Sequence, residues 1–125
     1  MTQEFIPYEQ ALELKELGFK YGCQRFYNKN KKLKWSFANG LGQEYFNQSD
    51  AVAAPLYQQA FRWFREKYDL FSYIDILERQ NGEVIYDYVI VNNDLEESED
   101  DRKWNTFEEA ELECLKQLIE ITKNK

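Results

Sequence analysis

The chain has 125 residues, 43% of them hydrophobic, and a formal net charge of -7. This length suits one compact domain, 1–125, and is too short for two separate cores. The acidic balance argues against generic binding to nucleic acid, which depends on basic side chains that displace counterions from phosphates. The absence of histidine excludes Ser-His-Asp and Cys-His nucleophiles and removes the commonest metal ligand. We therefore expect a single domain that is not an enzyme.

Two further absences bear on location and on thiol chemistry. No stretch approaches the run of about 20 apolar residues that spans a bilayer, and the N-terminus lacks the basic region of a signal peptide. Cys23 and Cys114 are far apart and follow no metal or redox spacing. We therefore expect reduced cysteines in a soluble protein that stays in the compartment where it is made.

The first predicted element is a helix that begins at Pro7. Proline is favoured at the first helical position, and the leucines up to Leu17 supply an apolar stripe. Gly18 follows directly and is well placed to end the helix, because glycine readily takes the left-handed conformation of a helix C-terminus.

A hairpin is predicted next, over residues 19–37 around a turn at 28–31. Leu33, Trp35 and Phe37 alternate with Lys32, Lys34 and Ser36. Because successive side chains of a strand point to opposite faces, this alternation separates the apolar side chains from the lysines.

Residues 38–50 predict a loop, with room for a short strand at 44–46. A second helix is predicted over 55–68, where apolar residues recur at helical spacing. The residues of this stripe are Tyr57, Ala60, Phe61, Phe64 and Tyr68. We expect this to be the main core helix.

The clearest local signal is the Asn-Gly pair at 81–82 between two strand-like runs, 71–78 and 84–91. Asn-Gly favours a two-residue type I′ turn. That turn would pair Gln80 with Glu83, Leu77 with Tyr86, Asp75 with Tyr88 and Tyr73 with Ile90. In this register Asp75 and Asp87 lie on opposite faces, so they are not expected to share a substrate. Both faces carry apolar residues, which predicts partial cover on each side.

An acidic stretch follows, and we expect it to form a mobile, solvated loop at about 93–103. Its candidate contact residues are Asp94, Glu96, Glu97, Glu99, Asp100 and Asp101. These carboxylates could associate weakly with calcium or magnesium, or mimic the phosphates of a nucleic acid in the groove of a partner. The stretch lacks the glycine and ligand spacing of an EF-hand loop, so we predict no metal site.

A third helix is predicted from residue 107 to about 122. Thr106 and Glu109 fit the S/T-x-x-E capping box, and an apolar stripe follows. Its residues are Ala110, Cys114, Leu115, Leu118 and Ile119. The element order α-β-β-α-β-β-α predicts an α+β domain, in which three helices pack on an antiparallel sheet of two hairpins.

Three segments carry a resemblance. They read IPYEQALELKELGF at 6–19, APLYQQAFRWFREKY at 54–68 and TFEEAELECL at 106–115. On these segments, which cover the three predicted helices, the chain resembles small uncharacterised proteins encoded by tailed phages and prophages of Bacteroidetes-type hosts. The resemblance implies origin but no activity or functional residues. It favours virion assembly, host takeover or interference with antiviral defence over metabolism.

Within this acidic chain, the segment between Leu17 and Gln43 has six basic residues and no acidic one. These candidate binding residues are Lys20, Arg25, Lys29, Lys31, Lys32 and Lys34. With the aromatic residues around them they could form a platform for single-stranded nucleic acid, a patch that docks an acidic protein, or a hairpin whose lysines protect an edge strand. The separation of rings from lysines favours edge protection, because a stacking platform needs both on one face.

Other chemistry has little support. Gly40 and Gly42 give only Gly-x-Gly, without the lysine of a phosphate-binding loop, and no cofactor is expected.

We therefore expect a non-enzymatic accessory protein that binds a host or phage protein in the cytoplasm of the infected bacterial host, with interference in antiviral defence as the leading role. The alternatives are a nucleic-acid-binding accessory protein that uses the basic hairpin and a minor component of the virion.

Overall fold

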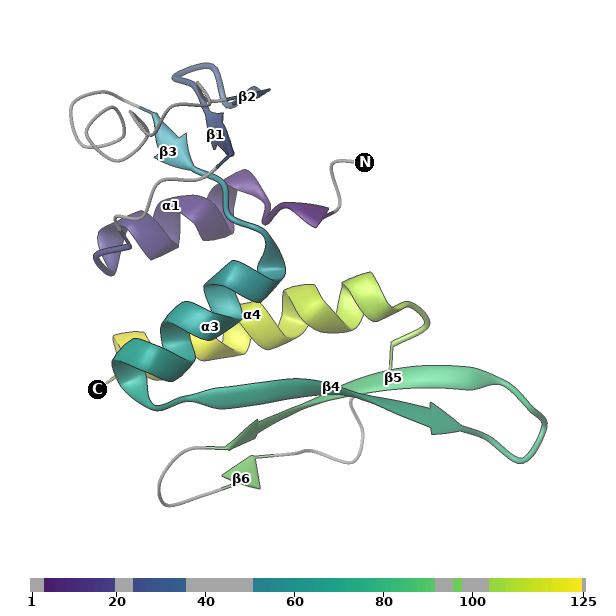
Figure 1. Cartoon of the computed structure of the whole chain (residues 1–125). Helices are drawn as coiled ribbons and strands as arrows, with labels where there is room; N and C mark the ends of the chain where they lie inside the picture. The colour runs from purple at the N-terminus through teal and green to yellow at the C-terminus, as the bar shows by residue number, and fades with distance from the viewer. Residues whose placement is uncertain (1–3, 20–23, 36–50, 92–95, 98–103, 125) are drawn as a thin grey trace. The chain divides into compact units, whose positions relative to one another are not determined.

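The structure is a computed structural model that describes residues 4–19, 24–35, 51–91, 96–97 and 104–124 (Figure 1). Of residues 96–97 it describes the backbone alone. In chain order its elements are α1 (Tyr8–Glu16), β1 (Arg25–Tyr27), β2 (Leu33–Trp35), β3 (Val52–Ala53), α3 (Tyr57–Tyr68), β4 (Phe71–Glu78), β5 (Val84–Val91), β6 (Glu96–Glu97) and α4 (Phe107–Lys123). The α+β class and the predicted order of helices and hairpins are confirmed.

The chain divides into two compact units, Met1–Gln59 and Ala60–Lys125, which are described separately. Each unit holds one of the two predicted hairpins within its own three-stranded sheet. The expectation of one sheet made from both hairpins is therefore wrong for the described residues, whereas the expectation of a single domain stays a prediction.

In unit 1, α1 ends as Gly18 predicts. Gly18 has a φ of 104° and its amide donates to the carbonyl of Lys15 at 3.1 Å. The amide of Phe19 donates to the carbonyl of Leu14 at 2.9 Å. This pair of bonds forms a Schellman motif, which satisfies carbonyls that the last helical turn leaves free. Pro7 precedes the helix as its N-cap.

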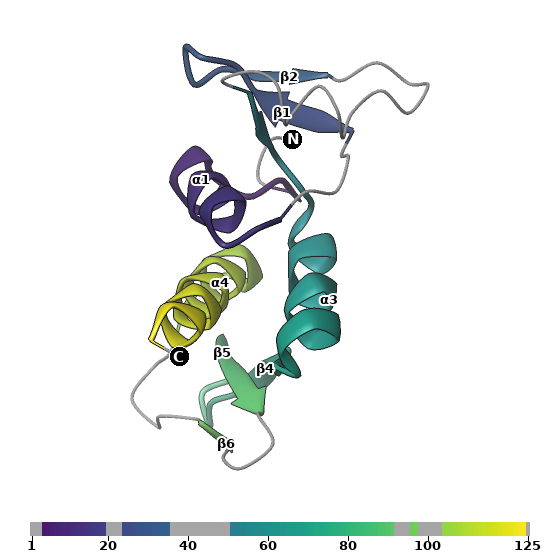
Figure 2. The ribbon, with the colours of Figure 1, turned by 90° about the vertical axis from the view of Figure 1, so that its left-hand side faces the viewer.

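The sheet of unit 1 has the strand order β2-β1-β3, so β2 is an edge strand among the described strands (Figure 2). In the turn between β1 and β2, the amide of Lys31 donates to the carbonyl of Asn28 at 2.8 Å, and the amide of Asn28 donates to the carbonyl of Lys32 at 3.0 Å. The connection is therefore a type I turn followed by a residue in the left-handed region, which is Lys31 with a φ of 64°.

The first and last segments of unit 1 pair with each other. Phe5 forms an isolated antiparallel bridge with Leu56, and the amide of Ile6 donates to the carbonyl of Pro55 at 3.0 Å. Because Pro55 and Leu56 take part in this pairing, α3 begins at Tyr57, two residues later than predicted. The fully buried side chains of the unit include Ile6, Leu14 and Pro55.

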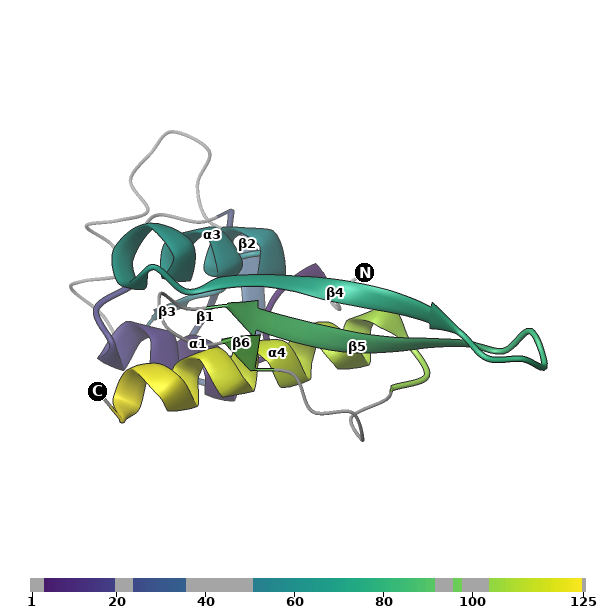
Figure 3. The ribbon, with the colours of Figure 1, turned by 90° about the horizontal axis from the view of Figure 1, so that it is seen from below.

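In unit 2, α4 packs on the sheet β4-β5-β6, mainly against β5 (Figure 3). The predicted cap is present, because the amide of Glu109 donates to Oγ1 of Thr106 at 3.1 Å. The predicted apolar stripe of α4 is buried, and it consists of Ala110, Cys114, Leu115, Leu118 and Ile119. Within the described ranges, none of the helices is both long enough and apolar enough to cross a membrane.

The second hairpin has the predicted strands but a different register. The amide of Gly82 donates to the carbonyl of Arg79, and the amide of Arg79 donates to the carbonyl of Glu83, both at 2.9 Å. The loop therefore has three residues, with Gly82 at a φ of 85°, instead of the predicted two-residue turn. The predicted pairings are wrong by one residue, and Asp75 lies directly opposite Asp87.

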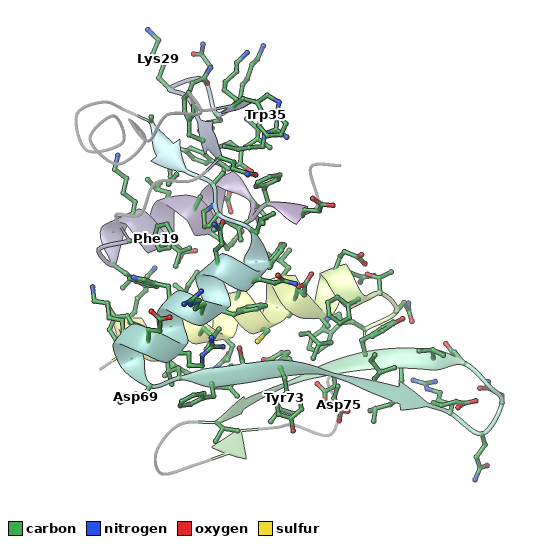
Figure 4. The ribbon with its side chains drawn as sticks, viewed as in Figure 1. Phe19, Lys29, Trp35, Asp69, Tyr73 and Asp75 are labelled. Carbon is green, nitrogen blue, oxygen red and sulfur yellow. The ribbon has the colours of Figure 1, made fainter. Side chains whose placement is uncertain are left out.

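This shift changes which side chains share a face, because a slip by one residue moves a strand's side chains to the other side of the sheet. Asp75 and Asp87 lie on the same face, contrary to the prediction. Figure 4 shows Tyr73 and Asp75 together on the side of β4 that is turned away from α3 and α4. The predicted register paired Tyr73 with Ile90, whereas in the structure Tyr73 lies opposite Val89.

The short strands β3 and β6 were not predicted. β3 pairs with β1, while Glu96 and Glu97 of β6 pair with Val91 and Ile90 of β5. This part of the acidic stretch is therefore paired with the sheet and is not the loop that its composition predicts. The remaining residues of that stretch and the predicted loop at 38–50 lie outside the described residues, so the predicted mobility stays a prediction.

Candidate binding surface on the first hairpin

The pairing of β1 with β2 brings a cation and a ring of the basic block together. Arg25 lies directly opposite Trp35, so the two side chains share a face. The guanidinium carbon of Arg25 is 4.4 Å from the centre of the Trp35 ring and 5.3 Å from the centre of the Phe5 ring. Both distances are within the range of about 6 Å for cation–π attraction. The guanidinium is thus held between a buried ring and a ring that is 68% exposed.

The guanidinium of Arg25 is not fully paired by the described residues. Its Nε is buried and has no hydrogen-bond partner in the described part of the chain. None of the ion pairs between described residues involves Arg25. A guanidinium presents a planar fork of donors that matches the two oxygens of a carboxylate or the oxygens of a phosphate. Held by two rings, Arg25 is oriented for that contact at little further entropic cost.

A second cation lies on a ring of the same unit. The Nζ of Lys31 is 5.3 Å from the centre of the Tyr8 ring, and the Tyr8 ring meets the Tyr27 ring edge to face at 5.5 Å. The Tyr27 hydroxyl donates to the carbonyl of Ile6 at 2.8 Å. Burial raises the pKa of Tyr27, against the opposing effect of Arg25, so the phenol stays protonated and keeps this bond at neutral pH.

Because Tyr27 is two residues from Arg25 in the same strand, Tyr27 and Arg25 point to the same side of the sheet. Their ring and cation contacts therefore belong to one surface. We call Phe5, Tyr8, Arg25, Lys31 and Trp35 the Arg–Trp surface.

Lys31 is in an unfavourable backbone conformation. A lysine in the left-handed region costs about 1 kcal/mol or more, and the matching position of the second hairpin is occupied by Gly82. The turn is fixed by Asn28, whose Oδ1 accepts the amides of Asn30 at 2.9 Å and Lys32 at 3.0 Å. Strained residues concentrate at functional sites, and a glycine would relieve the strain. This supports a role for the Lys31 side chain.

The other predicted basic residues lie apart from the Arg–Trp surface. Lys34 pairs with Phe26 and points to the opposite face from Trp35, as the alternation predicts. Lys32 and Lys29 are exposed at the turn, and Figure 4 shows Lys29 projecting from it. Lys20 lies outside the described residues.

The prediction that rings and charges are separated holds for Lys34 but is incomplete, because it overlooked Arg25 on the neighbouring strand. Trp35 is not a core residue, since it is 68% exposed. The pairing between Arg25 and Trp35 was the missing signal. It follows from the three-residue loop of this hairpin, which its sequence alone does not predict.

The acidic candidates are not brought together by the described residues. The backbone of Glu96 and Glu97 lies in β6, whereas the other members, which are Asp94, Glu99, Asp100 and Asp101, lie outside the described ranges. Within those ranges, no group of three or more Cys, Asp or Glu residues could hold a metal ion. Asp75 and Asp87 are two carboxylates on adjacent strands, and Asp87 Oδ1 accepts the amide of Tyr88 at 2.8 Å. This pair alone does not make a metal centre.

Comparisons with family models, with curated proteins and with solved structures find no match to this chain. The Arg–Trp surface is therefore the main guide to function.

Proposed function

We propose that the protein is a non-enzymatic binding protein that docks a carboxylate-rich surface of another protein through its Arg–Trp surface. The observation that carries this proposal is the exposed Trp35 ring with the Arg25 guanidinium 4.4 Å above it. Tryptophan, tyrosine and arginine dominate the binding energy of protein interfaces, because they combine large contact area with directed hydrogen bonds. The Arg–Trp surface contains one or more of each.

Charge favours an acidic protein over a polyanion as the partner. The net charge of -7 opposes approach to nucleic acid, whose affinity grows with the number of phosphates that basic residues neutralise. A carboxylate on a protein needs far less positive charge. One guanidinium fork can bind it through two parallel hydrogen bonds. Lys31, whose Nζ lies over the Tyr8 ring, supplies a second positive charge in the same unit.

The biological setting is part of the same proposal. The resemblance of the three helical segments to phage proteins favours a host or phage protein as the partner, in the cytoplasm of the infected bacterial host. Interference with antiviral defence is the leading specific role. A minor place in the virion is the alternative, and mass spectrometry of purified particles tests it, since absence of the polypeptide from virions would remove it.

The test is capture of partners from infected cells by the tagged chain, with two variants of the Arg–Trp surface and a matched control. Arg25→Lys keeps the charge but removes the fork, and Trp35→Ala removes the exposed ring. Arg62→Lys is the control, because Arg62 is exposed on α3 and pairs with Glu66. We expect one nuclease-resistant partner that the control retains and both variants lose. Equal capture by all three variants, or loss of the partner on nuclease treatment, would overturn the proposal.

A second candidate function rests on a specific observation. Because Trp35 is exposed and carries a cation on its face, it could stack with a base while Arg25 contacts a phosphate. This function predicts that a labelled single-stranded oligonucleotide shifts in a gel. Replacement of Lys31, Lys32 and Lys34 by alanine would abolish the shift, while capture of the acidic partner would depend mainly on Arg25 and Trp35. An oligonucleotide that does not shift removes this candidate.

A further inference from the structure

Strand β4 is an edge strand with little of the usual protection, because Asp75 and Glu78 are its only charged residues. It is the outer strand of the order β4-β5-β6, and its eight residues pair with β5 without interruption by a bulge. Its sequence, FSYIDILE, contains neither lysine nor proline. Proteins usually protect such edges with lysine, proline, bulges or short strands, because an open edge pairs with other chains. None of the described residues pairs with the outer side of β4.

The ladder with β5 determines which backbone groups of β4 are free. The amide of Arg79 donates to the carbonyl of Glu83 next to the loop. Because hydrogen-bonded and non-hydrogen-bonded pairs alternate in an antiparallel ladder, the odd-numbered residues of β4 bond to β5. The even-numbered residues direct their amides and carbonyls to the open edge. These residues are Ser72, Ile74, Ile76 and Glu78.

We propose that β4 pairs antiparallel with β4 of a second copy of this chain, about a two-fold axis that passes through Ile74. Such pairing joins the two sheets into one continuous sheet and satisfies the outward amides and carbonyls of both copies. It also gives neighbours to three exposed side chains. Phe71 is 46% exposed, Tyr73 is 54% exposed and Ile76 is 61% exposed.

The sequence of β4 fits itself in this register. A two-fold axis perpendicular to the sheet keeps each face on the same side, so odd residues meet odd residues and even residues meet even ones. Centred on Ile74, the register sets Phe71 against Leu77 and Ser72 against Ile76 of the second copy. Tyr73 then meets Asp75, a ring beside a carboxylate. No two like charges are opposed.

Registers centred on the neighbouring residues are less favourable, so we place the two-fold axis at Ile74. A register centred on Asp75 would set this carboxylate against its own copy, and each already faces Asp87 on β5. Like charges directly opposite each other in a sheet destabilise the pairing. A register centred on Tyr73 would set Phe71 against Asp75, so an apolar ring would meet a carboxylate.

Sedimentation equilibrium of the full chain tests this proposal. The mass should rise from 15.1 kDa toward twice that value as the concentration rises from about 10 µM to about 1 mM. Ile76→Lys places a charge at the open edge and should keep the protein monomeric over this range. Val84→Lys is the matched control, because Val84 is 44% exposed on β5, away from that edge, and it should still dimerise.

A second variant and a second readout keep the test decisive. Ile74→Pro removes one outward amide but no bond of the ladder with β5, so it should also give a monomer. In the parent chain, hydrogen exchange at Ser72, Ile74 and Ile76 should slow by about tenfold or more with concentration. A monomer at every concentration overturns the proposal. A dimer that persists in both edge variants also overturns it. The same holds for a dimer whose formation leaves the amides of Ser72, Ile74 and Ile76 unprotected, because that dimer would use another surface.

Discussion

The substitution Lys31→Gly separates the fold of the first hairpin from its proposed role. Lys31 has a φ of 64°, and the left-handed conformation costs a residue with a side chain about 1–2 kcal/mol. Glycine removes this cost. Glycine also lowers the free energy of unfolding by about 0.5–1 kcal/mol, because it increases the backbone entropy of the unfolded chain. The exposed contact with Tyr8 accounts for about a further 0.5 kcal/mol. The three contributions nearly cancel, so we expect Lys31→Gly to change the free energy of unfolding by less than about 1 kcal/mol, with a slight stabilisation at the centre of that range.

The assay is urea unfolding followed by circular dichroism, with the free energy extrapolated linearly to water. Lys31→Asn is the control, because asparagine tolerates the left-handed region but carries no charge. Both variants should be as stable as the parent chain or more so, and both should bind the acidic partner more weakly. If Lys31→Gly destabilises the protein by more than about 1 kcal/mol, the strain argument is wrong. If both variants bind the partner as well as the parent chain, Lys31 has no part in binding.

Three further predictions concern unit 2. Gly82→Ala should destabilise the protein by about 1 kcal/mol, because Gly82 has a positive φ that alanine adopts at a cost. Nothing lies within 4 Å of the added Cβ, so this cost is purely conformational. Urea unfolding measures it, and an unchanged free energy of unfolding would contradict the reasoning. Thr106→Ala should cost about 1 kcal/mol and fray the start of α4, whereas Thr106→Ser, which keeps the hydroxyl bond to the amide of Glu109, should cost less. Burial and then the charge of Glu108 raise the pKa of Glu111 from 4.5 to about 7. Since the folded state binds the proton more tightly, stability should fall as pH rises from about 4.5 to about 7, by about 1 kcal/mol after allowance for partial exposure. Glu111→Gln should remove that loss, and an unchanged pH profile in this variant would refute the assignment.

The helices could be predicted because their signals are local. Gly18 ends α1 and Thr106 caps α4, and each acts through hydrogen bonds within a few residues of the chain. The apolar stripe of α4 is buried as its spacing predicts, because a helix with a single apolar face has one way to pack.

The register of the second hairpin could not be predicted from its turn residues alone. Asn-Gly suits a two-residue turn, but glycine equally suits the left-handed position of a three-residue loop. The structure has the latter, and Oδ1 of Asn81 accepts the amide of Glu83 at 3.0 Å. The choice between the two loops moves every pairing by one residue, and it places Asp75 opposite Asp87.

The Arg–Trp surface and the short strands depend on contacts between distant segments. Arg25 contacts Phe5 and Trp35, which are 20 and 10 residues away along the chain, so no local sequence pattern predicts these cation–π contacts. Glu96 and Glu97 join the sheet through backbone bonds to β5, to which the acidic composition gives no clue. The lysines could be assigned to faces, because alternation within one strand is local.

The most direct test of the proposed function is the response of the Trp35 indole to a glutamate-rich peptide. Nuclear magnetic resonance resolves indole N–H signals, and Trp35→Phe identifies that of Trp35 beside those of Trp63 and Trp104. We predict that the peptide shifts the Trp35 signal, that Arg25→Lys weakens this binding by about tenfold, and that a single-stranded oligonucleotide of equal charge causes a smaller shift. A Trp35 signal that does not shift with the peptide, or that shifts more with the oligonucleotide, would contradict the proposed binding of an acidic protein.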